Sequence, residues 1–142
     1  MKDLFLHDSL DTSPVVFSDR ILYTPTSFAK TALLYLQEIG SLQAKKPHTS
    51  SRTRLSSYLF FCVNSGSGEL EYQGKRHKLG KGDCVFIDCQ LPYSHSTDTD
   101  LWSLSWIHFS GVTMQTVYQK YQERGGRPVF RPDNFTDFQS LH

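Results

Sequence analysis

The chain has 142 residues, 38% of them hydrophobic, and a net charge of +1 at pH 7. This length suits one domain rather than two independent cores, and the near-neutral charge argues against a surface for DNA or an anionic membrane. Its three cysteines form no CxxC pair, which disfavours a disulfide scaffold or zinc knuckle and fits a reducing cytoplasm. Neither a signal peptide nor the roughly 20-residue apolar run of a membrane span is recognisable, so no membrane contact is expected.

Residues 1–19 are expected to form an N-terminal arm outside the main body. The stretch is polar and weakly periodic, which favours a flexible terminus. It also has more hydrophobic residues than a purely solvated tail, so an arm folded over the body is the alternative. These hydrophobic positions are Leu4, Phe5, Leu6, Val15, Val16 and Phe17.

Residues 20–57 precede the most regular part of the chain. Arg20 to Tyr23 fit a short strand. Residues 28–40 are ambiguous, because their apolar spacing leans toward a helix while part of it also fits a strand. Residues 41–57 are polar and are expected to form a long surface loop, whose arginines could reach the rim of a pocket.

Residues 58–111 are the centre of the predicted fold. Apolar runs of strand length alternate with glycine turns about every 8–12 residues, which is typical of a small antiparallel barrel or sandwich. Gln73-Gly74 is expected to be a hairpin turn, and residues 88–100 are expected to be a polar loop. The expected strands are residues 58–63, 69–72, 76–79, 84–87 and 101–109.

The last of these strands has two faces of mixed polarity. Alternation places Trp102, Leu104, Trp106 and His108 on one side. Such a mixture suggests that one face lines something other than a dry core.

Helices are expected after residue 111. A helix capped by Ser110 should end at Gly125-Gly126. A short strand should follow at Val129-Phe130, and a second helix opening at Pro132 is cut off at His142, which suggests a further domain downstream. The apolar stripe of the first helix falls on Met114, Val117, Tyr118 and Tyr121.

Several of these pieces occur together, in the same order, in the N-terminal sensing domains of AraC-type bacterial transcription regulators, which the sequence resembles over about residues 33–111. The most specific part is the run Trp106-Ile107-His108-Phe109-x-Gly111. Because that family begins its barrel at this point, residues 33–39 are interpreted as a strand. The other matching positions are Gly66-x-Gly68, Gly74, Leu79-x-x-Gly82-Asp83, Phe86-Ile87, Pro92-x-x-His95 and Trp102.

The resemblance implies a mainly β fold, a cupin-like antiparallel β-barrel or jelly roll over residues 20–111. Helices over residues 112–142 would then serve dimerisation. It implies a cytoplasmic homodimer that binds a small polar effector, usually a carbohydrate, and needs no cofactor. In the family a helix-turn-helix domain follows; nothing here matches it, so DNA would be bound only through that missing domain.

Trp106 is the first candidate for effector binding. Its indole offers a flat apolar face for a sugar and an N–H for a hydroxyl, although an aromatic that simply fills the barrel is the alternative. Trp102 and His108 share its face. Leu104 stands where a sugar-binding relative carries a polar residue, which weakens the case for a sugar effector.

An arginine before the strand at residue 58 is the second candidate, since a rigid guanidinium suits hydroxyls and carboxylates. The spacing does not choose between Arg52 and Arg54. The remaining candidates for the effector site are Tyr35, Tyr58, Tyr93 and His95.

No metal site is expected. Metal-binding cupins carry a His-x-His pair with a downstream glutamate, and residues 62–71 contain no histidine. His77, His95 and His108 could still converge, so a small metal-dependent enzyme, an isomerase or dioxygenase, is the competing hypothesis. The absence of known catalytic motifs favours a non-enzymatic domain. A third possibility is a barrel filled by its own aromatics that serves only dimerisation.

Overall fold

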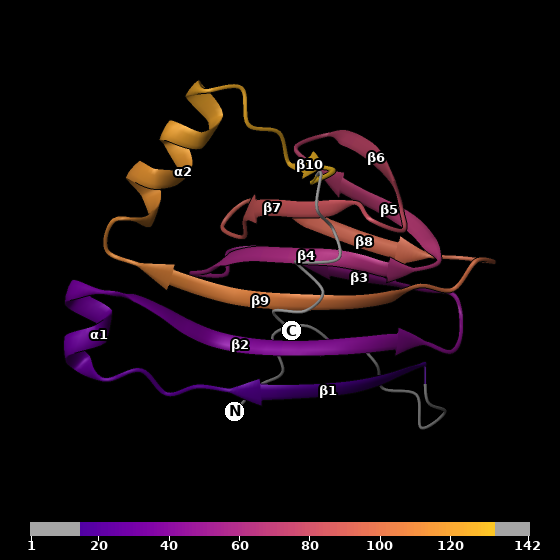
Figure 1. Ribbon diagram of the computed structural model, residues 1–142, viewed down its shortest axis with the longest axis horizontal. Coiled ribbons are helices and arrows are strands. Elements are labelled where there is room, and N and C mark those ends of the chain that lie inside the picture. The colour runs from indigo at the N-terminus through magenta and orange to yellow at the C-terminus, as the bar shows by residue number, and fades with distance from the viewer. Residues whose placement is uncertain (1–14, 133–142) are drawn as a thin grey trace.

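The computed structural model describes residues 15–132 as two antiparallel sheets that face each other, with two short helices (Figure 1). The helices are α1 (Ser27–Ala32) and α2 (Met114–Glu123). The larger sheet has the order β1 (Val16–Leu22), β2 (Leu34–Ala44), β9 (Ser103–Gly111), β4 (Tyr58–Ser65), β7 (Cys84–Asp88) and β10 (Val129–Phe130). The smaller sheet has the order β3 (His48–Arg52), β8 (Tyr93–Thr97), β5 (Ser67–Tyr72) and β6 (Lys75–Gly80).

The predicted barrel or sandwich of antiparallel strands is therefore confirmed. Along the chain, the strands from β4 to β7 and the strand β9 lie close to their expected positions. The expected hairpin turn joins β5 to β6, and both Gln73 (φ 51°) and Gly74 (φ 76°) have the positive φ of a two-residue hairpin turn. Within residues 15–132 the structure contains no helix with the length and apolarity of a membrane span.

The N-terminal part of the chain enters the sheet earlier than expected. β1 begins at Val16 and pairs with β2 along its whole length, from Val16 opposite Ala44 to Leu22 opposite Glu38. Residues 16–19 therefore belong to a strand rather than to an arm, because backbone pairing with an open strand edge needs no apolar pattern. The rest of the expected arm, residues 1–14, lies outside the described residues, and so does the expected second helix from residue 133.

The ambiguous stretch at residues 28–40 contains both a helix and a strand. Thr26 caps α1, since its Oγ1 accepts a hydrogen bond from the backbone N–H of Ala29 at 3.1 Å. The helix ends at Ala32, and β2 then runs to Ala44. The predicted strand at residues 33–39 is confirmed, although it starts at Leu34 and is longer than expected.

Two further strands lie where the sequence predicts loops. β3 falls inside the expected loop at residues 41–57, and β8 falls inside the expected loop at residues 88–100. The two strands pair with each other, and Ser50 lies opposite His95. Both loop predictions are wrong because these strands bury serine, tyrosine and histidine side chains, so they lack the apolar alternation that marks a half-buried strand.

Helix α2 packs against the outer face of the larger sheet. Its buried residues Met114 and Tyr118 contact Tyr58, together with the half-buried Phe86 and Phe109. The helix starts after Thr113 rather than after Ser110 because β9 continues to Gly111 in its pairing with β2.

The predicted apolar stripe of α2 is largely confirmed, with one exception. Val117 is 49% exposed, whereas Met114 and Tyr118 are buried and Tyr121 packs against them. Gly125, at φ 84°, follows the helix, as expected of a helix that ends at a glycine.

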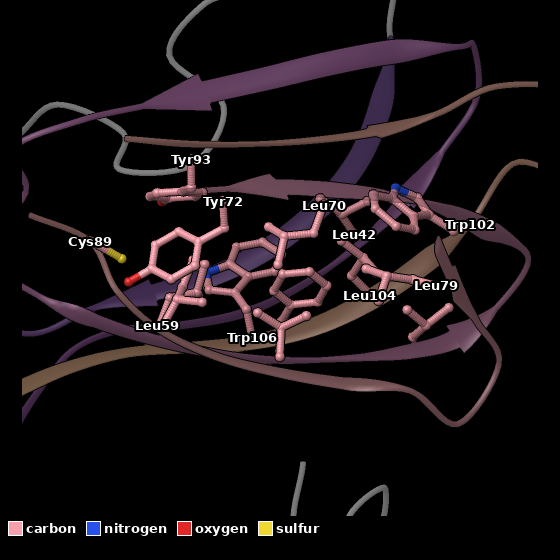
Figure 2. Packing of buried hydrophobic residues seen from close by; sticks show 14 of the residues in the cluster. Leu42, Leu59, Leu70, Tyr72, Leu79, Cys89, Tyr93, Trp102, Leu104 and Trp106 are labelled. Atoms are coloured by element: carbon pink, nitrogen blue, oxygen red, sulfur yellow. The ribbon is translucent and has the colours of Figure 1, made fainter. Parts of the chain in front are cut away.

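The main core fills the space between the two sheets, called the interior below. Trp102 is fully buried there, and its ring lies so close to Gly68 that a Cβ at that position would come within 2.4 Å of it. Figure 2 shows an apolar end of the interior with the side chains Leu42, Leu79, Trp102 and Leu104, while the side chains Tyr72, Cys89 and Tyr93 lie toward the other end.

Candidate functional site

Polar side chains gather toward the end of the interior where Tyr93 lies. One of them, His95, also contacts Trp102, with ring centroids 5.9 Å apart. The polar side chains come from both sheets, because inward-facing positions of β2, β4 and β9 meet those of β3 and β8. Seven of the eight are buried, and Arg52 is half-buried. This group, called the polar end below, consists of Glu38, Ser50, Arg52, Ser57, Tyr93, His95, Trp106 and His108.

Trp106 and Glu38 form the centre of the polar end. The indole Nε1–H of Trp106 donates a hydrogen bond to Oε2 of Glu38 at 2.8 Å, and both side chains are fully buried. The other carboxylate oxygen lies 3.6 Å from Nη1 of Arg20 on β1. A buried carboxylate is costly unless such donors surround it, so the indole N–H and the guanidinium together hold a negative charge inside the fold.

Gly40 makes the position of this indole possible. A Cβ built on Gly40 would lie 2.6 Å from a ring carbon of Trp106 and 2.7 Å from the carbonyl oxygen of Asp19. Gly40 lies directly opposite Trp106 in the pairing of β2 with β9. The absence of a side chain there lets the ring lie across β2 and reach Glu38.

His108 is the second buried polar group of the larger sheet. It lies opposite Glu38 in the strand pairing, and its Nδ1 is 3.0 Å from Oγ of Ser57. Ser57 precedes β4, and its carbonyl oxygen accepts a hydrogen bond from the backbone N–H of Cys89 at 3.0 Å. Ser57 therefore ties His108 to the start of β4 and to the loop after β7.

The smaller sheet contributes Tyr93 and His95, which stack with ring centroids 6.4 Å apart. Burial lowers the pKa of His95 to about 3, assisted by electrostatic repulsion from the neighbouring His48, Arg52 and His108. Burial likewise raises the pKa of Tyr93 well above its usual range. At neutral pH both rings are uncharged, and each can donate as well as accept a hydrogen bond.

A surface hollow of about 650 Å³ opens at this end of the molecule. Arg52 and Tyr93 belong both to its lining and to the polar end, whereas Trp106 does not line it. These two side chains are the ones that the hollow and the polar end share, and most of the other lining residues are exposed. The other lining residues are Ser51, Thr53, Glu71, Tyr72, Gln73, Gly74, Pro92 and Ser94.

The structure brings together five of the nine candidates from the sequence: Arg52, Tyr93, His95, Trp106 and His108. The two arginines differ in burial, because Arg52 is half-buried at the end of β3 while Arg54 is exposed beyond it.

The other three aromatic candidates lie elsewhere. Trp102 shares the inward face but lies at the apolar end, against Phe61 and His95. Tyr35 is opposite Ser110, beyond His108 on β9. Tyr58 lies outside the interior, with its ring centroid 5.4 Å from that of Tyr118 on α2.

Three polar residues of this region were missed from the sequence: Glu38, Ser50 and Ser57. Glu38 could have been found, because it continues the alternating buried positions Gly40, Leu42 and Ala44 once β2 is known to reach residue 44. The two serines carry no such signal, since nothing in the sequence marks a serine as buried.

The three histidines proposed as possible metal ligands do not converge. Leu70 of β5 pairs with His95 on one side and with His77 on the other, so these two histidines are two strands apart. Among residues 15–132, no group of three or more histidine, cysteine, aspartate or glutamate side chains is arranged to hold a metal ion.

Several solved structures are similar to this chain in fold. The chain is similar to a Cupin 2 conserved barrel domain protein from Leptotrichia buccalis (TM-score 0.52, 22% identity, 70% of this chain and 44% of that one). It is also similar to the Cnp3 cupin domain of Schizosaccharomyces pombe (TM-score 0.55, 12% identity, 84% and 77%). The AraC-like transcriptional activator CuxR matches with a TM-score of 0.55 and 14% identity, over 87% of this chain and 49% of that one. These likenesses show the cupin fold.

The chain spans 44% of the Leptotrichia protein and 49% of CuxR, so it corresponds to about half of each. A search of curated proteins found no match. The sequence model of the AraC-like ligand binding domain matches residues 36–139, which is most of the chain. The match runs from β2 through β10 and includes all eight residues of the polar end. The chain belongs to the family of AraC-like ligand binding domains.

Proposed function

We propose that this chain is the effector-sensing domain of a cytoplasmic bacterial transcription regulator, and that its effector binds at the polar end of the interior. The observation that carries the proposal is that two side chains, Arg52 and Tyr93, belong both to the buried polar group and to the lining of an open hollow. Arg52 and Tyr93 line that hollow and also face the buried group around Glu38 and His108. A pocket with a few convergent polar groups in an apolar body is the usual form of a small-molecule site.

The chemistry of the polar end supports a small, hydroxyl-rich metabolite such as a carbohydrate. Neutral Tyr93 and His95 each donate and accept hydrogen bonds, which suits hydroxyl groups better than it suits an ion. Glu38 adds a carboxylate acceptor, and Arg52 adds a charged donor. A strongly anionic effector would meet the buried charge of Glu38, which disfavours it.

The proposed regulator acts as a homodimer and binds DNA through a separate C-terminal domain. The net charge of +1 supports the absence of DNA contacts from these residues. Ligand binding would change regulation only if the effector contacts differ between two states of the protein.

Arg52 and Arg54 offer a matched test. The Arg52→Gln and Arg54→Gln variants each remove one guanidinium, but only Arg52 lines the hollow. A panel of neutral sugars and sugar acids would first be screened for ligands that raise the melting temperature of the unaltered chain. For the best ligand, calorimetry should show that Arg52→Gln weakens binding about 10- to 100-fold, as expected for a lost charged hydrogen bond.

Arg54→Gln should leave that affinity unchanged. Equal losses in both variants, or no stabilising ligand in the panel, would contradict the proposal. Elemental analysis of protein purified without nickel or chelator tests the competing enzyme hypothesis, which requires a stoichiometric metal ion.

A further inference from the structure

Two of the three cysteines lie side by side on the outer face of the larger sheet. Cys62 of β4 and Cys84 of β7 are directly opposite each other, although 22 residues separate them in the sequence. Their Sγ atoms are 2.8 Å apart, and both are free thiols. The third thiol, Cys89, points into the interior and has no cysteine opposite it.

The backbone geometry at this pair favours a covalent bond between the two sulfurs. The next pair along the strands is hydrogen-bonded, since the N–H of Val63 donates to the carbonyl oxygen of Asp83 at 2.9 Å. Cys62 and Cys84 therefore occupy a non-hydrogen-bonded position, where Cα atoms of antiparallel strands approach to about 4.5 Å. That separation falls inside the range of about 4.4–6.8 Å that a disulfide bridges.

We propose that Cys62 and Cys84 form a redox modification site, a dithiol that hydrogen peroxide converts reversibly into an intramolecular disulfide. The two cysteines are brought together by the register of β4 and β7, so no local sequence motif identifies the pair.

The reaction balances with one peroxide molecule. The Cys62 thiolate attacks one peroxide oxygen, the O–O bond breaks, and the departing hydroxide takes up the proton that Cys62 has lost, which leaves Cys62 as a sulfenic acid. The Cys84 sulfur then attacks the Cys62 sulfur, the S–O bond breaks, and the second hydroxide leaves as water with the proton of Cys84. The two thiols have lost two electrons, and peroxide has become two water molecules.

The surroundings give the two thiols different roles. The Cys84 S–H can donate to the Cys62 sulfur, and this hydrogen bond lowers the pKa of Cys62. The same hydrogen bond, with burial, raises the pKa of Cys84. Cys62 is 7% exposed whereas Cys84 is fully buried. The lower pKa and the slight exposure of Cys62 assign it as the thiol that peroxide oxidises first, and Cys84 as the resolving thiol.

The disulfide would link β4 to β7, the strand that pairs with the last strand of the fold, β10. Phe130 of β10 pairs with Cys84, and the following Arg131 donates to Oδ1 of Asp83 and to the carbonyl oxygen of Lys81. A disulfide at Cys84 would fix β7 to β4 and close a loop that includes β5 and β6. Closing this loop restricts the unfolded chain, so oxidation should raise the melting temperature by roughly 5–10 °C.

The test uses the Cys89→Ser variant of the whole chain, which leaves only the two proposed thiols. After brief treatment with hydrogen peroxide, intact mass spectrometry should show a loss of two hydrogen atoms, and peptide mapping should show a Cys62–Cys84 link. Dithiothreitol should restore both thiols. The matched Cys84→Ser/Cys89→Ser variant should instead gain one oxygen at Cys62, which dimedone traps.

Three results would overturn the proposal. They are thiols that stay reduced in the Cys89→Ser variant, sulfinic acids without a cross-link, and a link between two molecules instead of within one. The melting temperature gives a second readout on the same samples, since a genuine cross-link raises it and a sulfenic acid in Cys84→Ser/Cys89→Ser does not.

Discussion

The two ends of the interior use the same residue type in opposite ways. Trp102 lies just before β9 and Trp106 lies within it. Both side chains point into the interior, and both are fully buried. At the polar end, the indole N–H of Trp106 donates to the carboxylate of Glu38. At the apolar end, the indole N–H of Trp102 has no hydrogen-bond partner within residues 15–132. Trp102 therefore acts as a volume-filling ring, while Trp106 holds a buried charge in place.

This difference is the reason for placing the proposed effector site at the polar end. At the apolar end, Trp102 packs on Gly68 and against the rings of Phe61 and His95, in a cluster that also contains Leu42, Leu79 and Leu104. The polar end contains hydrogen-bonding groups whose burial costs free energy, so their presence inside the fold calls for an explanation. Four predictions test the contrast, beginning with the largest expected effect.

Replacement of each tryptophan by phenylalanine should separate the two roles. Trp106→Phe removes a hydrogen bond to a buried carboxylate, which costs about 1.5–3 kcal/mol in addition to the lost ring volume. Trp102→Phe also loses volume, but it removes an unpaired donor and should cost about 1–2 kcal/mol less. Urea unfolding of both variants measures the difference. Equal losses would mean that the Glu38 contact contributes nothing to stability.

Gly40→Ala should be the next largest perturbation. The added methyl would meet the Trp106 ring at 2.6 Å and a backbone oxygen at 2.7 Å, so overpacking should cost about 1–3 kcal/mol. Gly80→Ala is the matched control, because nothing lies within 4 Å of its Cβ position. It should change the unfolding free energy by less than about 0.5 kcal/mol. Similar values for both would argue against close packing of the ring on β2.

The polar end should also make stability depend on pH. The pKa of His95 is about 3 in the folded chain because of burial and of electrostatic repulsion from His48, Arg52 and His108. Its unfolded value is about 6.5, so the unfolded chain binds more protons between these values. Stability therefore falls as the pH decreases below about 6.5, with a loss of about 2 kcal/mol between pH 7 and pH 5.

Urea unfolding at the two pH values measures this loss. His95→Gln should remove this part of the pH dependence. His77→Gln, at a half-buried position of β6, should keep it. A pH dependence unchanged by His95→Gln would contradict the burial of a neutral imidazole.

The two ends of the interior differ in how well their structure could be predicted from the sequence. The apolar end follows from local patterns, because the alternation in residues 101–109 and the apolar run at residues 58–63 mark buried strands directly. The polar end depends on β3 and β8, whose buried faces are polar and were interpreted as loops. Their strand character comes from pairing with each other, which is a contact between distant segments.

The same limit applies to single residues. Trp106 and His108 were identified because a family motif includes them, whereas the partners Glu38 and Ser57 became visible only when the strands were aligned. The contact between Cys62 and Cys84 has the same origin, since a shift of β7 by one residue would place the thiols on opposite faces. The pattern of residue types predicted an antiparallel barrel or sandwich. The register of the paired strands determines which side chains contact each other.

The smallest effect is predicted for two tyrosines in different surroundings, one inside the interior and one on the outer face of the larger sheet. Tyr93 lines the hollow at the polar end, whereas Tyr58 packs under α2 on the outer face. With the sugar that stabilises the chain most, Tyr93→Phe should weaken binding about 3- to 10-fold, the effect of one neutral hydrogen bond. Tyr58→Phe should leave the affinity unchanged. Calorimetry at constant pH measures both, and the reverse order would move the effector site from the interior to the face beneath α2.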